Sequence, residues 1–143
     1  MEEQDLPICA EILARAYAQA PYFEKFLPDV AIGYMRSRFG FCRSGSFIVE
    51  GEGRIFGFLL ASLSVWTSGK QAIIEEIVID PDYQGCGYGK GLMAAAEKYL
   101  QEAGAVSIIL WSRKDSPAHS FHLRNGFADS KDWVIMDKNL EED

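Results

Sequence analysis

The chain has 143 residues, 48% hydrophobic composition and a formal net charge of −7 at pH 7. This length supports one ordinary hydrophobic core, so we expect a single domain over residues 1–143. The negative charge and the lack of a basic stripe argue against nucleic acid as a partner and suit a neutral or cationic one.

The cysteines and the N-terminal residues bear on location. Cys9, Cys42 and Cys86 are odd in number and form no CxxC pair, so neither a disulfide framework nor a zinc site is predicted. No stretch has the ~20 apolar residues of a membrane helix, and MEEQDLP lacks the basic start and apolar core of a signal peptide. We therefore expect a cytoplasmic protein without membrane contact, either a monomer or a homodimer.

Helical spacing dominates the N-terminal part of the chain. Asp5 is the expected N-cap of a first helix, with Pro7 in its first turn and apolar residues recurring at intervals of three and four up to Tyr17. The sequence VAIGYMRSRFG, over 30–40, favours a second helix, although Gly33 lowers its helix propensity.

The rest of the chain reads as a sheet with helices. Two strand-like runs, SFIVE and IFGFLLASLSV, flank the polar turn GEGR and predict a β-hairpin. The later patterns predict, in order, a third strand over 73–80, a helix over 91–104 that stops at Gly104, a buried strand over 105–111, a short helix over 116–126 and a final strand over 131–140. This order indicates an α/β (α+β) fold with one mixed sheet flanked by helices on both faces.

Four glycines lie where the third strand hands over to a helix: Gly85, Gly87, Gly89 and Gly91. Glycines at this place let main-chain N–H groups converge on an anion, and the helix dipole adds partial positive charge. A tight turn that needs positive φ is the alternative. A Walker A loop needs Ser or Thr after Lys90, and GxGxxG is absent, so neither common nucleotide motif fits.

Two motifs carry a resemblance to a known family. Gln84-x-x-Gly87-x-Gly89 resembles the pyrophosphate loop of the GNAT acetyltransferase superfamily, and PAHSFHLRNGF, over 117–127, is similar to the closing motif of that family. The order of segments is also similar to that of aminoglycoside 6′-N-acetyltransferase-like members. The chain departs from the family at its start, where the usual N-terminal edge strand is missing or very short.

The resemblance implies an acyl-CoA donor, with acetyl-CoA as the donor substrate. Its pantetheine arm would lie along the third strand like an added strand, and its pyrophosphate on the loop amides. The residues so implied are Ile77, Val78 and Ile79 for the arm, Gln84, Gly85, Cys86, Gly87, Tyr88, Gly89 and Lys90 for the pyrophosphate, and Asp115 and Phe121 nearer the end of the chain. Asp115 stands where the family often has an asparagine that touches the CoA arm, and its other possible role is the N-cap of the short helix.

Glu75 and Glu76 interrupt an apolar strand. The two-residue period of a strand predicts that they point to opposite faces, with Glu75 in phase with Ile77 and Ile79. An ammonium must lose a proton before it attacks a thioester, and a partly desolvated carboxylate can accept that proton. Similar family members carry a glutamate on this strand, so Glu75 is the expected base. A solvated or ion-paired carboxylate is the alternative.

His122 stands where similar enzymes have a tyrosine that protonates the departing CoA thiolate. A helix-surface histidine without a role is the alternative. His119 and His122 lack a third ligand, so no metal site is predicted. Cys86 lies among the loop amides, but no orienting base is identified for it, and we interpret it as an inert loop cysteine.

The residues and the resemblance together predict an N-acetyltransferase, a GNAT-type acyltransferase that moves an acetyl group from acetyl-CoA to a primary amine in a ternary complex. The expected acceptor is a small-molecule amine, and the acidic charge suits a cationic one such as a polyamine or an aminosugar. The alternative is a catalytically inactive acyl-CoA-binding module. A hydrolase that uses Cys86 is a third hypothesis.

Overall fold

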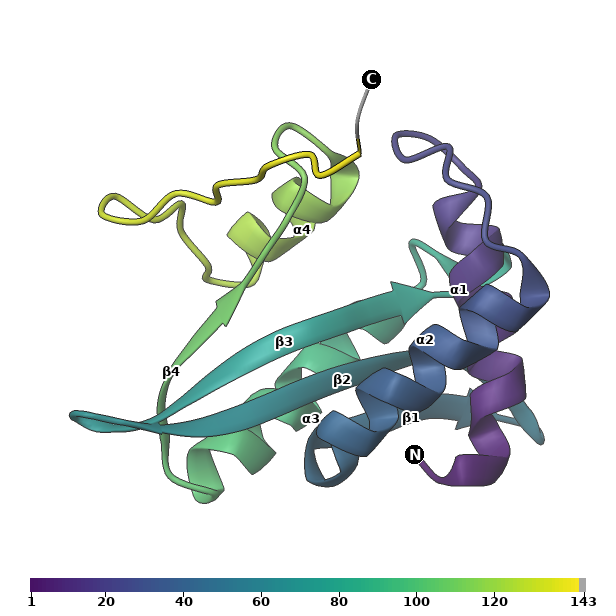
Figure 1. The fold of residues 1–143 in the computed structure, drawn as a ribbon. Coiled ribbons are helices and arrows are strands. Elements are labelled where there is room, and N and C mark those ends of the chain that lie inside the picture. Colours follow the sequence, from purple (N-terminus) through teal and green to yellow (C-terminus); the bar gives the residue numbers. More distant parts are fainter. Residues whose placement is uncertain (142–143) are drawn as a thin grey trace. The chain divides into compact units, whose positions relative to one another are not determined.

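A computed structural model describes residues 1–141 (Figure 1). Its elements are a 3-10 helix at Glu3–Asp5, α1 (Leu6–Tyr17), α2 (Pro28–Phe41), β1 (Ser46–Gly51), β2 (Arg54–Trp66), β3 (Gly69–Ile79), α3 (Tyr88–Glu102), β4 (Ala105–Leu110) and α4 (Pro117–Arg124). The chain forms one compact unit over Met1–Trp111 and a second from Ser112 onward. The single domain expected over 1–143 stays a prediction.

The first unit contains a mixed four-stranded sheet in the order β1-β2-β3-β4. β2 pairs antiparallel with both β1 and β3, and β4 joins β3 in parallel. The hairpin expected between β1 and β2 is confirmed, and its turn places Glu52 and Gly53 at φ 52° and 74°. The parallel step from β3 to β4 needs a crossover, which α3 supplies.

Helices cover both faces of this sheet, as the sequence predicts (Figure 1). On one face, α1 and α2 pack over β2 and β3, and the core there includes Ile12, Leu13, Met35, Phe58 and Leu60, all fully or almost fully buried. α3 covers the other face, where the ring of Tyr99 meets Phe47 of β1 at a centroid distance of 5.5 Å.

α3 begins and ends at glycines. Gly87 is its N-cap at φ 88°, and the chain leaves the helix through Gly104 at φ 97°, which is the C-terminal stop expected from the sequence. Its apolar side chains at three- and four-residue spacing face inward, so Leu92, Met93, Ala96 and Leu100 are buried.

Several expectations are corrected. The final strand predicted over 131–140 does not form within the described residues, and the side chains of Trp133, Val134 and Met136 are more than 80% exposed. Strand propensity alone produces no strand without a neighbour that pairs with its main chain. β4 is not buried as expected, because it is the edge strand of the described sheet and exposes Val106 and Ile109.

The N-terminus agrees with the expected departure from the family. A 3-10 helix and α1 precede β1, and no strand comes before them in the described chain. Asp5 directly precedes α1 as predicted, but its carboxylate makes no cap to that helix and instead accepts from the Glu2 amide at 2.7 Å. No helix within residues 1–141 is both long enough and apolar enough to cross a membrane.

Candidate active site

A β-bulge in β3 brings Glu75 and Glu76 to the same side of the sheet. Leu60 of β2 is opposite Glu76 and Ala61 is opposite Ile74, so Glu75 is an extra residue in the ladder. A bulge breaks the two-residue alternation of side chains. The prediction that the two carboxylates point to opposite faces is therefore wrong, because both contact side chains of α2.

Glu76 is held by two tyrosines from two helices. The hydroxyl of Tyr34 on α2 donates to it at 2.7 Å, and that of Tyr17 at the end of α1 lies 3.1 Å from each carboxylate oxygen. Burial raises the pKa of the Glu76 carboxyl, although both tyrosine hydrogen bonds act in the opposite direction. Burial, together with the adjacent Glu76 charge, also raises the pKa of each tyrosine, so both hydroxyls keep their protons at neutral pH.

Glu75 has a different set of partners. Its Oε1 accepts from the Ser62 hydroxyl at 3.1 Å, and its Oε2 lies 3.3 Å from an Arg38 guanidinium nitrogen. The Glu75 side chain is 16% exposed. The Arg38 guanidinium also stands 5.3 Å from the centre of the Tyr34 ring. The two carboxylates therefore belong to one polar network that joins α1, α2, β2 and β3.

The edge of β3 is open beyond this bulge. Its pairing with β4 ends at Ile74 opposite Leu110. The Asp80 amide donates to Phe56 of β2 at 2.8 Å, so by alternation Val78 directs its main chain to β2, whereas Ile77 and Ile79 direct theirs to the opposite edge. The Ile79 carbonyl accepts from the Gln84 side chain at 3.1 Å. The N–H and C=O of Ile77 and the N–H of Ile79 are thus available to an added strand.

The glycine loop joins this edge to the N-terminus of α3. Gly85 and Gly87 have φ values of 77° and 88°, a region that L-residues with side chains rarely occupy. α3 begins at Tyr88, and the amides of its first turn, Tyr88, Gly89 and Lys90, have no acceptor within the helix. The structure therefore brings together the strand, the loop and the free amides that the sequence predicts for a diphosphate.

Gln84 and Cys86 differ in what they contribute to the loop. The Gln84 amide holds the Ile79 carbonyl, so its side chain braces the strand end. Cys86 is exposed and its sulfur lies 3.8 Å from the Gln84 carbonyl oxygen. Among the described residues no base contacts this thiol, and its interpretation as an inert loop cysteine stays a prediction.

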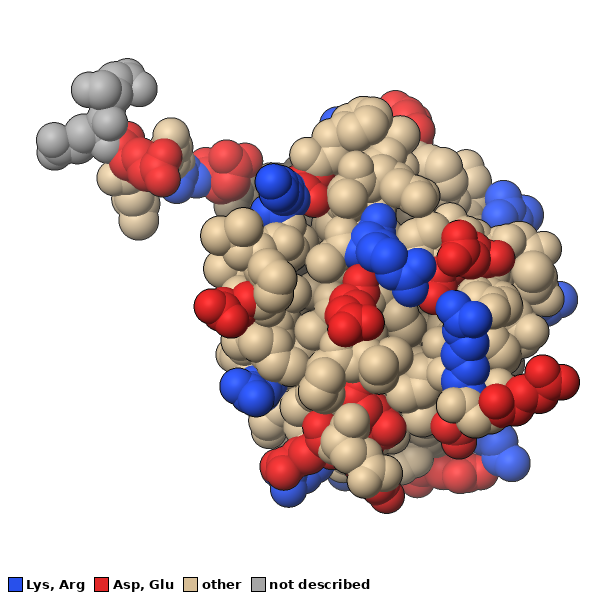
Figure 2. Space-filling view, turned by 90° about the vertical axis from the view of Figure 1, so that its right-hand side faces the viewer, with Lys and Arg blue, Asp and Glu red and all other residues tan. Residues whose placement is uncertain are grey.

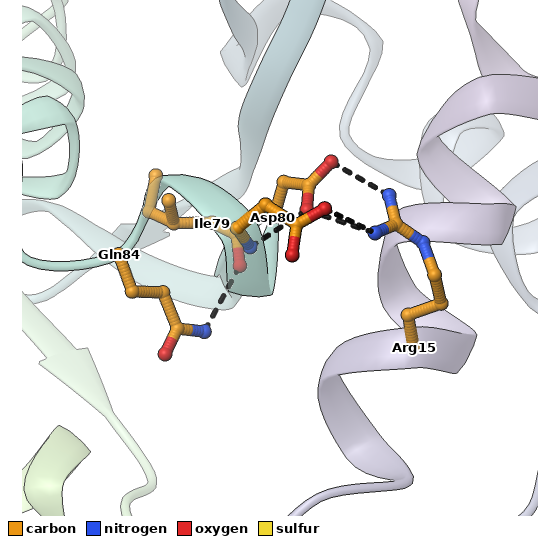
Figure 3. A network of polar contacts seen from close by, with 5 residues as sticks. Arg15, Ile79, Asp80 and Gln84 are labelled. Carbon is orange, nitrogen blue, oxygen red and sulfur yellow. Dashed lines mark hydrogen bonds and ion pairs between the residues drawn. The ribbon is translucent and has the colours of Figure 1, made fainter.

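Sequence reasoning missed the ion pair that anchors this loop to α1. The two terminal guanidinium nitrogens of Arg15, Nη1 and Nη2, donate to the Asp80 carboxylate at 2.9 and 2.6 Å (Figure 3). Asp80 is 1% exposed, and the Arg15 hydrogen bond holds the pKa of its carboxyl below the usual value. The two residues are far apart in sequence, so only one signal was available: a charge at the end of the apolar run IVID.

The second unit carries the remaining predicted residues. Asp115 has φ 59°, and Ser116 is the N-cap of α4, because its hydroxyl accepts from the His119 amide at 3.1 Å. The alternative role of Asp115 as N-cap is therefore wrong. The Asp115 amide instead donates to His119 Nδ1 at 3.2 Å, and the other ring nitrogen of His119 contacts Asp129 at 2.6 Å. These contacts close the segment before α4 onto the helix.

His122 belongs to this unit, and its side chain is buried and not on the surface of α4. It is 5% exposed, between the rings of Phe121 and Phe127 at centroid distances of 5.2 and 5.6 Å. Burial lowers its pKa, so the imidazolium is scarcer at neutral pH than for an exposed histidine. Its Nδ1 is buried without a hydrogen-bond partner among the described residues.

The charge distribution is mixed. On the face that Figure 2 shows, acidic and basic side chains are both present, and neither sign covers the whole face. Within residues 1–141 no group of three or more His, Cys, Asp or Glu side chains is arranged to hold a metal ion. The charged groups that stand out are therefore the paired carboxylates and the Arg15–Asp80 contact.

A strand with an open edge, a glycine loop and a helix N-terminus follow one another here, an arrangement whose main-chain groups can bind a peptide-like arm and an anion. The model of the Acetyltransferase (GNAT) family matches residues 10–127. The chain therefore belongs to this family of acyl-group transferases.

Relatives of known name support the same assignment. Glucosamine 6-phosphate N-acetyltransferase of Trypanosoma brucei brucei is 33% identical over 121 residues, which are 81% of this chain and 79% of that protein. Mycothiol acetyltransferase of Arthrobacter sp. (strain FB24) is 39% identical over 82 residues, 55% of this chain and 25% of that protein. Aminoglycoside N(6′)-acetyltransferase type 1 of Stenotrophomonas maltophilia is 31% identical over 75 residues, 52% of this chain and 49% of that protein. The chain thus spans a quarter to a half of the length of several relatives that it matches.

Solved structures show the same fold. A possible acetyltransferase from Clostridium difficile 630 superposes with a TM-score of 0.82 at 12% identity, covering 99% of this chain and 95% of that one. A transcriptional regulator from Bacillus halodurans C-125 gives a TM-score of 0.76 at 20% identity, with 96% of both chains covered. At these identities the likeness concerns the fold alone.

Proposed function

We propose that the chain is an N-acetyltransferase that moves an acetyl group from acetyl-CoA to a primary amine by direct attack in a ternary complex. The observation that carries this proposal is the continuous run from the open edge at Ile77 and Ile79 through the glycine loop to the free amides of α3. A thioester donor with a peptide-like arm and a diphosphate matches each part of that run in turn.

The donor is held mainly by main chain. The pantetheine amides pair with the Ile77 and Ile79 edge as an added strand, and Val78 lies between these residues with its main chain turned to β2. The pyrophosphate accepts hydrogen bonds from the amides between Gly85 and Lys90. Asp115 and Phe121, in the second unit, remain proposed contacts of the donor on the resemblance alone.

The chemistry requires two protons to leave the ammonium nitrogen and one to reach the sulfur. The ammonium gives its first proton to a carboxylate, the amine nitrogen forms a bond with the thioester carbon and then loses its second proton, and the carbon–sulfur bond breaks to release CoA thiolate. The thiolate then takes a proton. We propose Glu75 as the base and His122 as the acid, in the absence of a covalent intermediate on the enzyme.

Two properties distinguish Glu75 from Glu76 as the base. Burial raises the pKa of Glu76, as a base requires, but hydroxyls of Tyr17 and Tyr34 occupy its oxygens. Glu75 accepts one hydroxyl hydrogen bond and makes a longer contact of 3.3 Å with Arg38. Glu75 therefore keeps more free lone pairs for an incoming ammonium, and Glu76 serves to hold the tyrosines and the local negative charge.

The acceptor is proposed to be a small cationic amine, because the two carboxylates face one side of the sheet and the chain carries a net charge of −7. The test combines isothermal titration with acetyl-CoA and release of free thiol across a panel of polyamines, aminosugars and aminoglycosides. Binding together with amine-dependent thiol release supports the transferase. Binding without release for any amine supports the acyl-CoA-binding module, and no binding of CoA rejects both.

A further inference from the structure

Asp80 is the point at which three elements meet before the glycine loop. Its carboxylate accepts from the two terminal guanidinium nitrogens of Arg15, and also from the Asp82 amide at 3.0 Å. Its own amide donates to Phe56 of β2, and its carbonyl accepts from the Tyr83 amide, both at 2.8 Å. Every polar group of this residue is thus engaged, which fixes where β3 ends and in which direction the chain leaves it.

Arg15 and Asp80 differ strongly in solvent exposure. The Asp80 side chain is 2% exposed and that of Arg15 is 47% exposed. A buried carboxylate needs its cation, because an uncompensated charge away from water is strongly unfavourable. Without Arg15, the Asp80 carboxylate would have to take up a proton or move toward water, and the segment that follows it would move as well. Arg15 therefore determines the position of the loop although it belongs to a different element.

A second contact holds the same loop from the other side. The Phe56 ring packs on Tyr83 at 4.4 Å and stacks on Tyr88, the first residue of α3, at 5.0 Å. The loop from Tyr83 to Tyr88 is thus anchored at both ends on β2, and Asp80 is the polar fixed point just before it. Gly85 and Gly87 lie between these anchors, and because they have no Cβ they can adopt the positive φ values that the loop requires.

We propose that the Arg15–Asp80 pair is a positioning device for the diphosphate of the donor: Arg15 touches no substrate but holds the loop amides in the arrangement that binds it. This inference rests on the proposed use of an acyl-CoA donor. It assigns to α1 a role in donor affinity that neither the glycine motif nor the paired carboxylates indicate.

The test compares two donors in matched variants. Arg15→Met removes the guanidinium and keeps much of the apolar stem, and Arg15→Lys keeps the charge without the two-pronged contact. The control is Arg43→Met, which breaks an arginine–carboxylate contact of 2.9 Å with Glu3, exposed on both sides. The donors are acetyl-CoA and S-acetylpantetheine, and the second lacks the diphosphate.

For Arg15→Met we expect the Kd of CoA and the KM of acetyl-CoA to rise about 10-fold, with kcat at saturation and kcat/KM for S-acetylpantetheine within about 2-fold of the parent protein. Arg15→Lys should show a smaller rise, and it decides the matter if the Met variant does not fold. Arg43→Met should behave as the parent protein with both donors.

Equal losses of kcat/KM with both donors would show a general structural role and overturn the inference. Unchanged CoA affinity in folded Arg15→Met would overturn it as well. Where that variant does not fold, unchanged affinity in Arg15→Lys has the same meaning. In either case the proposed function stands if the parent protein binds CoA and releases thiol. Failure of the parent protein to bind CoA overturns both.

Discussion

Glu75 and Glu76 are consecutive in the chain, yet each contacts α2, Glu75 through Arg38 and Glu76 through Tyr34. The bulge that permits this places two carboxylates side by side in one network. Because the two adjacent carboxylates have different partners, a substitution of one is a matched control for the same substitution of the other.

The first prediction concerns the base. Glu75→Gln should lower the rate about 10²-fold at neutral pH and less at high pH, where the free amine needs no base. Glu76→Gln should keep the tyrosine contacts through its amide oxygen and reduce the rate less. Stopped assays of thiol release from pH 6 to 10 measure both profiles, with melting temperatures as the control for folding. A silent Glu75→Gln beside a damaging Glu76→Gln would assign the role to Glu76.

The second prediction concerns the glycine loop. Gly87→Val should raise the Kd of CoA at least about 10-fold, because a side chain at φ 88° strains the loop that carries the amides. Gly87→Asn adds a side chain that tolerates this backbone conformation, and it should weaken binding with less loss of stability. Titration calorimetry gives the affinities.

The matched control for the loop is Gly33→Val in α2, where an added Cβ meets nothing within 4 Å. This variant should bind CoA as the parent protein does. Parent-like affinity in a folded Gly87→Val protein would place the diphosphate elsewhere.

The third prediction follows from burial of His122. Burial lowers its pKa below the usual 6.5, so if the imidazolium protonates the thiolate, the activity it supports falls as pH rises through that lowered value. His122→Phe should remove this limb of the pH profile, and His122→Tyr should restore activity and extend it to higher pH, because a phenol keeps its proton. Identical profiles for the parent and the Phe variant from pH 5 to 9 exclude His122 as the acid.

The fourth prediction concerns stability and Asp80. Its folded pKa lies below the unfolded value of 3.8, so its stabilisation is complete above that value and is lost as pH falls through the folded pKa. Asp80→Asn should lower the free energy of unfolding by about 2–3 kcal/mol at pH 7, toward the low end for broken buried pairs because Arg15 is half exposed. The difference from the parent should shrink as the pH falls through the lowered folded pKa. Urea titrations at several pH values provide the measurement, and a pH-independent difference would contradict the assignment.

Sequence patterns predicted much of this fold for identifiable reasons. The hairpin follows from the turn at Gly53, and α3 follows from a helical apolar face that ends at Gly104, since these are local properties of the chain. The glycine loop was found because its residues are close in sequence. The strand predicted over 131–140 failed because strand formation depends on a partner that local sequence does not reveal.

The candidate site was harder to predict than the fold. The shared side of Glu75 and Glu76 depends on a register shift between Leu60 and Ala61, which no periodicity within β3 encodes. The Arg15–Asp80 contact joins residues 65 positions apart. Tyr17 looked like one more member of an apolar helix face, and only its buried hydroxyl, which needs a partner, pointed to Glu76.

α1 carries Arg15 and Tyr17 only two positions apart, and these residues reach Asp80 before the donor loop and Glu76 beside the proposed base. The last turn of α1 therefore contacts both the residue before the donor loop and the residue next to the proposed base. We therefore expect a change in the last turn of α1 to affect both the donor loop and the carboxylate pair. Transfer rates are sensitive to errors of about 1 Å in the distance between thioester carbon and amine nitrogen, so a substitution in this turn can lower the rate without touching either substrate.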